Sequence, residues 1–310
     1  MEPPVSVQRP FRFGVVVRKA DSAKAWADRA RLLEDSGVST LLVPDHVIGA
    51  RFGPIAAMTA AAAVTTSLRV GTLVLSNDYR HPVILAKEAA SIDVLSDGRL
   101  DLGLGTGWLR QDYDQAGLAF DPPKVRFERF TEAVHVLKGL WSGEPFSFAG
   151  THYRIDGLVQ DPRPVQRPGP RLLFPGGGTR MLKFAAREAD SINLTLRVKP
   201  DGTAPDERDG GLAAFLGKIE TVREAAGERF DNVELGTSVQ EIGARSGAEA
   251  WSYANTSRQG ETPQVLLGDT EQIADKLRYW RDAHQVSYFV LHNDKDLDAF
   301  LPVVAKLAGS

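Results

Sequence analysis

The stretch RLDLGLGTGW, residues Arg99–Trp108, carries the most informative pattern in this chain of 310 residues. An alternating apolar run leads into Gly103, Gly105 and Gly107, and a large aromatic side chain follows at once. Alternation with a period of two predicts a β-strand. Glycines at its end let a flat ring or a phosphate lie against the backbone, because glycine has no Cβ. A tight turn is the alternative, and the spacing does not match the GxGxxG nucleotide fingerprint.

On both sides of this strand, periods of two and of 3.6 residues take turns along most of the chain. We expect strands over Arg12–Val17, Thr40–Val43, Val70–Leu75, Leu100–Leu104, Leu172–Phe174, Ser191–Leu194, Val233–Val239 and Val286–Leu291. We expect helices over Ala23–Asp35, Ile55–Val64, Pro82–Leu95, Val125–Leu140, Thr179–Glu188, Leu212–Ala226, Thr270–Ala283 and Leu297–Leu307. Eight strand–helix units predict an α/β fold, a (β/α)8 TIM barrel forming one domain over residues 1–310. An open, doubly wound sheet is the competing architecture.

Three stretches interrupt this alternation. Residues 145–155 alternate around Gly150, which predicts a β-hairpin inserted after the fourth helix. Residues 199–211 and 243–263 are polar and follow strands, so we expect them to form long loops over the C-terminal mouth of the barrel. Loops of this length are usually functional lids or disordered segments, and the sequence leaves both interpretations open.

The composition excludes several kinds of partner. With 37 Lys and Arg against 40 Asp and Glu, the net charge is −3, which gives no electrostatic reason to expect a nucleic acid. The absence of cysteine excludes disulfides and thiolate chemistry, and the histidines lack metal-ligand spacing. The N-terminus lacks a signal core, and no uncharged stretch approaches the roughly 20 residues of a membrane span. We therefore expect a cytoplasmic protein that binds no metal, nucleic acid or membrane.

Polar residues follow the second and third expected strands. Asp45 and His46 end the second strand, in a βα loop on the face where barrel enzymes keep their chemistry. Histidine can transfer a proton near neutral pH, although a histidine that caps a strand end is the alternative. Asn77, Arg80 and His81 stand where the third strand opens into the mouth.

A second glycine cluster lies at a strand-to-helix junction. Gly176, Gly177 and Gly178 precede Thr179, which begins the next expected helix. Free amides and the helix dipole favour an anion at such a terminus, and Arg180 adds positive charge. These residues predict a phosphate site, with a flexible turn as the alternative.

Taken together, these motifs resemble the luciferase-like monooxygenase superfamily, in particular its branch that uses the deazaflavin coenzyme F420. The resemblance runs from Phe13 to about Leu196 and is weaker from Gly268 onward. It is carried by Pro44–His46 (PDH), Gly71–Val74 (GTLV), His81–Arg99 (HPVILAKEAASIDVLSDGR), Leu102–Trp108 (LGLGTGW) and Pro175–Leu182 (PGGGTRML).

The resemblance implies where the cofactor lies. Its ring would occupy the barrel mouth, backed by a bulge in the third strand with a cis peptide bond between Leu73 and Val74. Gly107 and Trp108 would line the substrate side, and the resemblance also implies a homodimer. The implied cofactor-binding residues are Asp45, His46, Leu73, Val74, Asn77, Thr106, Gly107, Gly176, Gly177, Gly178 and Thr179.

By the same resemblance, the protein is an oxidoreductase that transfers a hydride between F420 and a small organic molecule. His46 would exchange the accompanying proton. Trp108 stands where sugar-phosphate dehydrogenases of the superfamily have a glutamate general acid, which disfavours that substrate class and favours a flat, apolar one. A monooxygenase that uses reduced FMN is the first alternative, and a non-catalytic flavin-binding protein is the second. A cofactor-free hydrolase has no support, because neither an acid pair nor a Ser-His pairing is evident.

Overall fold

The computed structural model describes residues 8–48, 52–243 and 260–310. Parallel strands form one closed barrel, in the order β3-β2-β1-β13-β10-β9-β8-β5-β4, and pairing of β3 with β5 closes the ring. The bounds are β1 (Arg12–Val16), β2 (Thr40–Val43), β3 (Arg69–Thr72), β4 (Leu75–Ser76), β5 (Leu100–Gly105), β8 (Arg171–Gly176), β9 (Ser191–Leu194), β10 (Glu234–Val239) and β13 (Val286–Leu291). Because β3 and β4 are successive parts of one barrel strand, the (β/α)8 prediction is confirmed.

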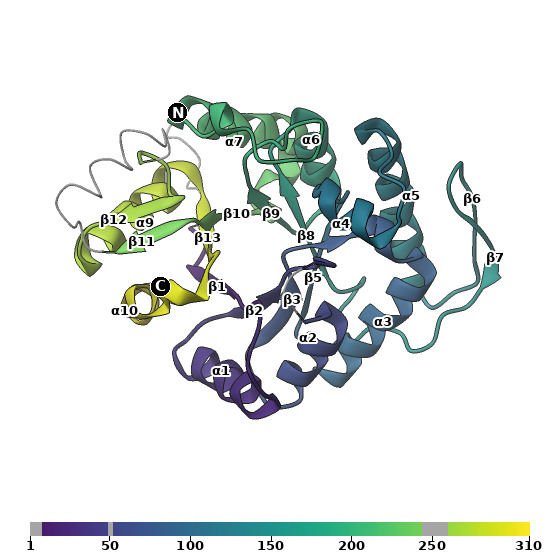
Figure 1. The fold of residues 1–310 in the computed structure, drawn as a ribbon, viewed down its shortest axis with the longest axis horizontal. Coiled ribbons are helices and arrows are strands. Elements are labelled where there is room, and N and C mark those ends of the chain that lie inside the picture. Colours follow the sequence, from purple (N-terminus) through teal and green to yellow (C-terminus); the bar gives the residue numbers. More distant parts are fainter. Residues whose placement is uncertain (1–7, 49–51, 244–259) are drawn as a thin grey trace.

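Helices surround the barrel (Figure 1). Their bounds are α1 (Ala23–Asp35), α2 (Pro54–Ala62), α3 (Pro82–Leu95), α4 (Arg110–Ala116), α5 (Pro123–Trp141), α6 (Thr179–Glu188), α7 (Leu212–Ala226), α9 (Thr270–His284) and α10 (Leu297–Leu307). Short 3-10 turns lie at η1 (Asn77–Tyr79), η2 (Glu207–Asp209), η3 (Gly227–Asn232) and η4 (Asp294–Asp296). No helix of the described ranges combines the length and apolarity needed to cross a bilayer.

The structure differs from the sequence-based expectations in three places. The expected strand over residues 70–75 is divided between β3 and β4, and α4 was not predicted. The strands β11 (Glu241–Gly243) and β12 (Val265–Leu267) form a small parallel pair, also unpredicted. The hairpin is confirmed as β6 (Phe146–Ala149) and β7 (Arg154–Leu158), and it projects from the edge of the molecule (Figure 1).

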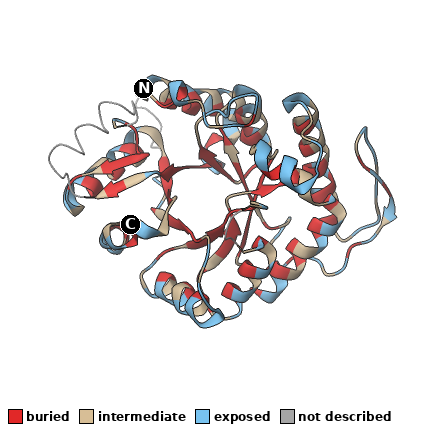
Figure 2. Cartoon of the chain, viewed as in Figure 1, coloured by how far each residue is buried: buried red, intermediate tan, exposed pale blue. Residues whose placement is uncertain are grey.

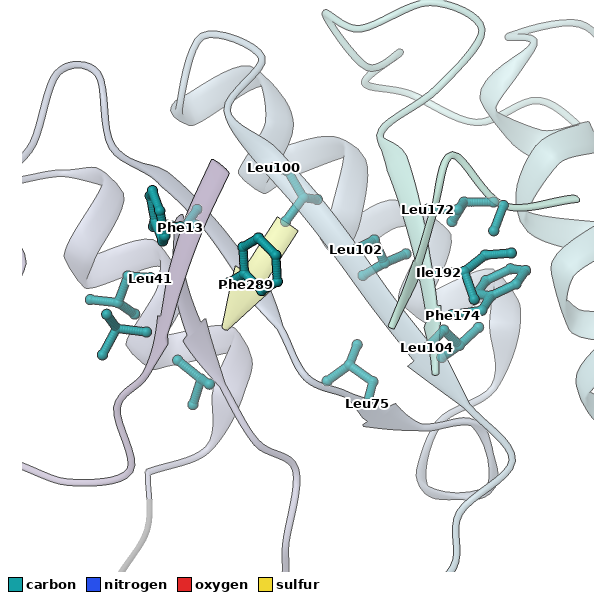
Figure 3. Close-up of a cluster of buried hydrophobic side chains, with 14 of the residues drawn as sticks. Phe13, Leu41, Leu75, Leu100, Leu102, Leu104, Leu172, Phe174, Ile192 and Phe289 are labelled. Atoms are coloured by element: carbon teal, nitrogen blue, oxygen red, sulfur yellow. The ribbon is translucent and has the colours of Figure 1, made fainter. Parts of the chain in front are cut away.

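The apolar core lies mainly between the barrel and its helices. Strand residues such as Phe13, Leu41, Leu100, Leu102 and Phe174 are buried in this layer (Figure 3). The strands at the centre of the molecule are buried, whereas the outer faces of the helices are exposed (Figure 2). Period-two alternation sends the intervening side chains of each strand into the barrel.

Those inward positions explain the glycines of β5. A Cβ at Gly103 would stand 1.8 Å from the carbonyl oxygen of Thr72, and one at Gly105 would stand 3.0 Å from a methyl of Val74. Both glycines therefore make room for neighbouring parts of the barrel wall. For Gly103, this revises the expectation that the glycine makes room for a ligand.

An ionic cluster occupies the opposite, N-terminal end of the barrel. Arg12 lies 2.7 Å from both Asp101 and Glu234, and Arg69 lies 2.7 Å from Asp101. Arg171 pairs with Glu234 at 3.1 Å. Burial alone would raise the pKa of Asp101, but Arg12, Arg69 and Arg171 outweigh it and lower that pKa to about 2. Charged side chains therefore close this end, and the large cavity of the protein lies at the other end.

Candidate functional site

The C-terminal ends of the barrel strands surround a cavity of about 1230 Å³. Small-ligand sites typically measure about 300–1,000 Å³, so this cavity has room for a cofactor and a small substrate together. Nine of the twelve sequence-predicted site residues line it: Asp45, His46, Leu73, Val74, Thr106, Gly107, Trp108, Gly177 and Gly178. Most of the residues that the sequence and the resemblance indicated therefore lie on the cavity wall.

The other three predicted residues are absent from the cavity wall. Asn77 is only 2% exposed, and its amide donates to the hydroxyl of Tyr153 at 3.3 Å. Gly176 belongs to β8, and a Cβ there would stand 2.7 Å from Leu182. Thr179 is the first residue of α6 and is exposed. We correct the expectation that the Asn77 side chain faces a cofactor, because that side chain packs inside the protein.

The floor of the cavity includes the break between β3 and β4. The peptide bond between Leu73 and Val74 is cis, which confirms the expectation drawn from the resemblance. Leu73 and Val74 also pack against apolar side chains inside the barrel, including Val16, Leu42 and Leu173. The break therefore presents a continuous apolar surface to the cavity.

Asp45, which was expected to bind the cofactor, is paired with other residues of the protein. Its carboxylate pairs with Arg80 at 2.5 and 3.1 Å and accepts the amide hydrogen of Ser76 at 3.0 Å. Asp45 is 9% exposed. Both of its oxygens already have partners, so Asp45 chiefly holds the segment after β4 against the end of β2.

His46 is held by a carboxylate that the sequence reasoning missed. Its Nδ1 lies 2.7 Å from Oδ2 of Asp112, a residue of α4 that is 1% exposed. The other carboxylate oxygen accepts the amides of Val47 and Ile48, each at 3.1 Å. With Nδ1 directed at Asp112, Nε2 is the nitrogen available to a ligand. In the sequence, the one indication of Asp112 as a site residue was its place four positions after Trp108, in a helix that the periodicity did not predict.

Trp108 completes this side of the cavity. Its ring stands edge-on to the His46 ring, with centroids 6.0 Å apart and an angle of 90°. Gly107 before it has φ +75°, and a Cβ there would stand 1.9 Å from the hydroxyl oxygen of Tyr113. Gly107 therefore lets the backbone pass over Tyr113 and carry Trp108 to the cavity.

The expected loop 199–211 is folded and forms part of the cavity wall. The carbonyl of Gly202 accepts the amide of Arg110 at 3.1 Å, which ties the loop to the residues beside Trp108. At its base, Asp209 accepts the amide of Arg197 at 2.8 Å and pairs with Lys218 of α7 at 2.7 Å. Lys199 and Pro200 of this loop line the cavity. Most of the other expected loop, 243–263, lies outside the described residues.

The N-terminus of α6 has features that suit an anion. Its N-cap, Gly178, provides no side-chain hydrogen bond, and no atom lies within 4 Å of the place where a Cβ would stand. Gly177 has no such space, because a Cβ would stand 2.5 Å from the backbone of Leu196. Arg180 and Lys199 line the same cavity, and neither pairs with a carboxylate of the described residues. Exposed amides and two cations together suit a phosphate.

No group of three or more potential metal-binding side chains occurs in the part of the chain that the structure describes. The cavity instead combines an apolar floor, an aromatic wall, an oriented imidazole and a cationic helix terminus. Such a site can hold a flat anionic cofactor and exchange a proton beside it.

Comparisons with known proteins indicate a family of oxidoreductases. A family model described as luciferase-like monooxygenase matches residues 5–301. The F420-dependent glucose-6-phosphate dehydrogenase of Amycolatopsis mediterranei is 27% identical over 79% of this chain and 74% of its own. An FMNH2-dependent dimethylsulfone monooxygenase of Pseudomonas fluorescens is 30% identical over 57% of this chain and 50% of its own.

The fold is also shared with a solved structure. The coenzyme F420 dependent tetrahydromethanopterin reductase of Methanopyrus kandleri superposes with a TM-score of 0.76 over 96% of this chain and 98% of its own. Its identity to this chain is 16%, so the likeness shows the fold alone.

Proposed function

The chain belongs to the luciferase-like monooxygenase family, and from this premise we propose that it transfers a hydride between coenzyme F420 and a small, flat, largely apolar molecule. One observation carries the proposal: the His46–Asp112 pair stands beside Trp108 at a cavity floored by Leu73 and Val74. Hydride transfer to a carbonyl, imine or activated alkene requires a proton donor or acceptor beside a flat apolar surface that holds the cofactor ring.

The residues present fit a deazaflavin. The apolar surface at Leu73 and Val74 suits a tricyclic ring, and the free amides at the start of α6 suit its phosphate. The F420 tail adds carboxylates beyond that phosphate. Arg180, Lys199 and Lys124 line the cavity and offer more positive charge than a single phosphate needs. This surplus favours F420 over FMN.

When bound, the deazaflavin supplies the hydride donor or acceptor. Nε2 of His46 exchanges the proton that accompanies the hydride, while Asp112 holds Nδ1 and so fixes the ring orientation. Trp108 provides a flat wall that orients an apolar substrate, and orientation alone can contribute several kcal/mol to lowering the barrier. Since Trp108 cannot transfer a proton, sugar phosphates remain a disfavoured substrate class.

Cofactor binding tests the proposal directly. The apoprotein is titrated with F420 and, separately, with FMN, and the affinity of each is measured. Reduced F420 is then added with cyclic enones, imines and quinones, and oxidation of the cofactor is followed by absorbance. We expect F420 to bind and at least one of these classes to oxidise it. Tight binding of FMN with none of F420 would overturn the proposal.

A monooxygenase that uses reduced FMN is the second candidate. It is favoured by the 30% identity to an FMNH2-dependent dimethylsulfone monooxygenase. Deazaflavin has carbon in place of the flavin N5, so its reduced form reacts poorly with oxygen. Substrate-dependent oxygen consumption with reduced FMN, and none with reduced F420, identifies this candidate.

A further inference from the structure

The cavity has a polar side that the proposed chemistry does not use. Asn193 and Ser238 line it from the ends of β9 and β10. In the closed barrel, β9 lies four strands from β2 in either direction, so Asn193 stands across the barrel from His46. The residues assigned above to the cofactor follow β2, β3, β5 and β8, except Lys199, which follows β9 further along the chain.

Asn193 is buried and incompletely paired. It is 1% exposed, and its Nδ2 donates to Oγ of Ser238 at 3.0 Å. Its Oδ1 is buried and has no hydrogen-bond partner. Turning the amide by 180° exchanges its two polar atoms and leaves the amino group unpaired instead. An unpaired buried amide is unfavourable unless some group pairs with it.

The surroundings of Asn193 indicate the kind of group that would pair with it. Ser191, one inward position below, also has an unpaired hydroxyl, but it does not line the cavity. Gln264, which is 3% exposed, lines the same side and is neutral like Asn193 and Ser238. A neutral hydroxyl or N–H can pair with such side chains, which by themselves offer an anion no positive charge in exchange for its hydration.

We propose that Asn193 and Ser238 form a substrate subsite that receives a neutral hydroxyl or N–H group. This proposal rests on the proposed function, because it takes the opposite side of the cavity as the cofactor side. It narrows the substrate to a flat, largely apolar molecule with one hydrogen-bonding group at the end remote from the reacting bond. Oδ1 of Asn193 accepts the hydrogen of that group, and Ser238 holds the amide in position.

Phenol and toluene test the subsite, because they match in shape and differ in one hydroxyl. The Kd of each is measured by ligand-observed NMR on the full-length protein, with and without bound F420. We expect the wild type to bind phenol roughly fivefold to tenfold more tightly than toluene. Asn193→Leu should abolish this preference while leaving the Kd of toluene unchanged.

Two serine variants keep the test informative if Asn193→Leu folds poorly. Ser238→Ala should weaken the preference for phenol, and Ser238→Thr, which keeps the hydroxyl, should retain it. Thermal unfolding confirms that each variant is folded. A wild type that binds both probes equally, or a preference that survives in both Asn193→Leu and Ser238→Ala, overturns the subsite.

Measuring F420 binding to the wild type and to Asn193→Leu shows whether the group that pairs with Asn193 belongs to the substrate or to the cofactor. If Asn193→Leu weakens F420 binding as much as it weakens phenol binding, the amide serves the cofactor ring, and the substrate subsite is wrong. If F420 does not bind the wild type at all, the proposed function fails instead. The phenol preference is then still measured on the protein without F420, so the two failures are distinguishable.

Discussion

At the scale of single residues, several polar side chains of the site have their hydrogen-bonding atoms paired with other residues of the protein. His46 is different, because Asp112 occupies one ring nitrogen and leaves the other available to a ligand. Asp45, by contrast, has both carboxylate oxygens paired within the protein. Burial with complete pairing makes Asp45 a positioning residue, whereas His46 can act on a ligand.

Replacing His46 should therefore impair the chemistry more than the binding of the cofactor. We expect His46→Ala to lower kcat by roughly 10²–10⁴-fold, the range that a positioned proton donor contributes. The rate of F420 oxidation measures this, and F420 titration checks that affinity is kept. His81→Ala is the matched control, since His81 caps α3 and does not line the cavity. Equal losses in both variants would contradict the role given to His46.

Gly107 provides a second test at this scale. Both Gly107 and Gly117 have positive φ, +75° and +70°, so an alanine at either position is strained. Only at Gly107 does the added methyl also meet a neighbour, the hydroxyl of Tyr113. We expect Gly117→Ala to cost about 1 kcal/mol of unfolding free energy and Gly107→Ala at least 1–3 kcal/mol more, as typical for overpacking. Urea unfolding measures both free energies. Similar losses would contradict the prediction, because they would mean that Tyr113 moves away from the added methyl at little cost.

At the scale of elements, β5 shows how one strand serves two layers. Its leucines pack against helices, while Gly103 and Gly105 face the neighbouring barrel strands and Val74. The glycine series that suggests a ligand site is therefore partly a requirement of barrel packing. Gly105 and Gly107, but not Gly103, line the cavity together with Trp108.

The loop 199–211 is held at its base by a buried ion pair. Lys218 and Asp209 have side chains that are 6% and 5% exposed and lie 2.7 Å apart, and Asp209 also holds Arg197. Removing one partner of a buried pair typically costs ~3–5 kcal/mol, because the other charge remains buried.

We expect Asp209→Asn to loosen this loop, to accelerate its cleavage in limited proteolysis and to raise KM more than it lowers kcat. Lys218→Met should have a smaller effect, because Asp209 keeps its contacts with Arg197. Arg208→Ala is the control, since that arginine is mostly exposed and outside the buried pair. Cleavage rates that do not differ between Asp209→Asn and Arg208→Ala would contradict this account.

At the scale of the whole molecule, stability and function lie at opposite ends of the barrel. The N-terminal end is filled by Arg12, Asp101, Glu234 and their partners, drawn from strands across the barrel. The C-terminal end contains the cavity. This separation lets substitutions at the ionic end change stability without altering the site.

The ionic end predicts a dependence of stability on pH. The pKa of Asp101 is about 2 in the folded protein, below its ordinary value of 3.8. The carboxylate therefore contributes stability that is fully present above about pH 4 and is lost as the pH falls through about 2. The shift corresponds to about 2–3 kcal/mol.

We expect Asp101→Asn to lower the free energy of unfolding at pH 7 by ~3–5 kcal/mol, because Arg12 then stays buried with less compensation. The variant should also lose less stability than the wild type between pH 4 and pH 2. Urea unfolding across this range measures both effects. Asp28→Asn, which removes an exposed pair with Lys24, should change little. An equal acid dependence in the wild type and Asp101→Asn would contradict the assignment.

The sequence by itself determined the fold, and most of the predicted site residues lie on the cavity wall. Several elements, such as α1, β2, α3 and β13, begin and end where the periodicity predicts. Hydrophobic period is a property of adjacent residues, and eight repeats of one strand–helix unit suffice to indicate the barrel. The position of the cis bond and of Trp108 came from the family resemblance.

Only the tertiary structure decided how the polar side chains are paired. Asp112 lies 66 positions from His46, and Arg80 lies 35 from Asp45, so no local pattern connects them. The burial of Asn77 and the unpaired amide of Asn193 likewise depend on barrel strands and loops that meet only when the ring closes. Local periodicity specifies which face of a strand is buried, whereas the partner of each buried polar group is set by packing between distant segments.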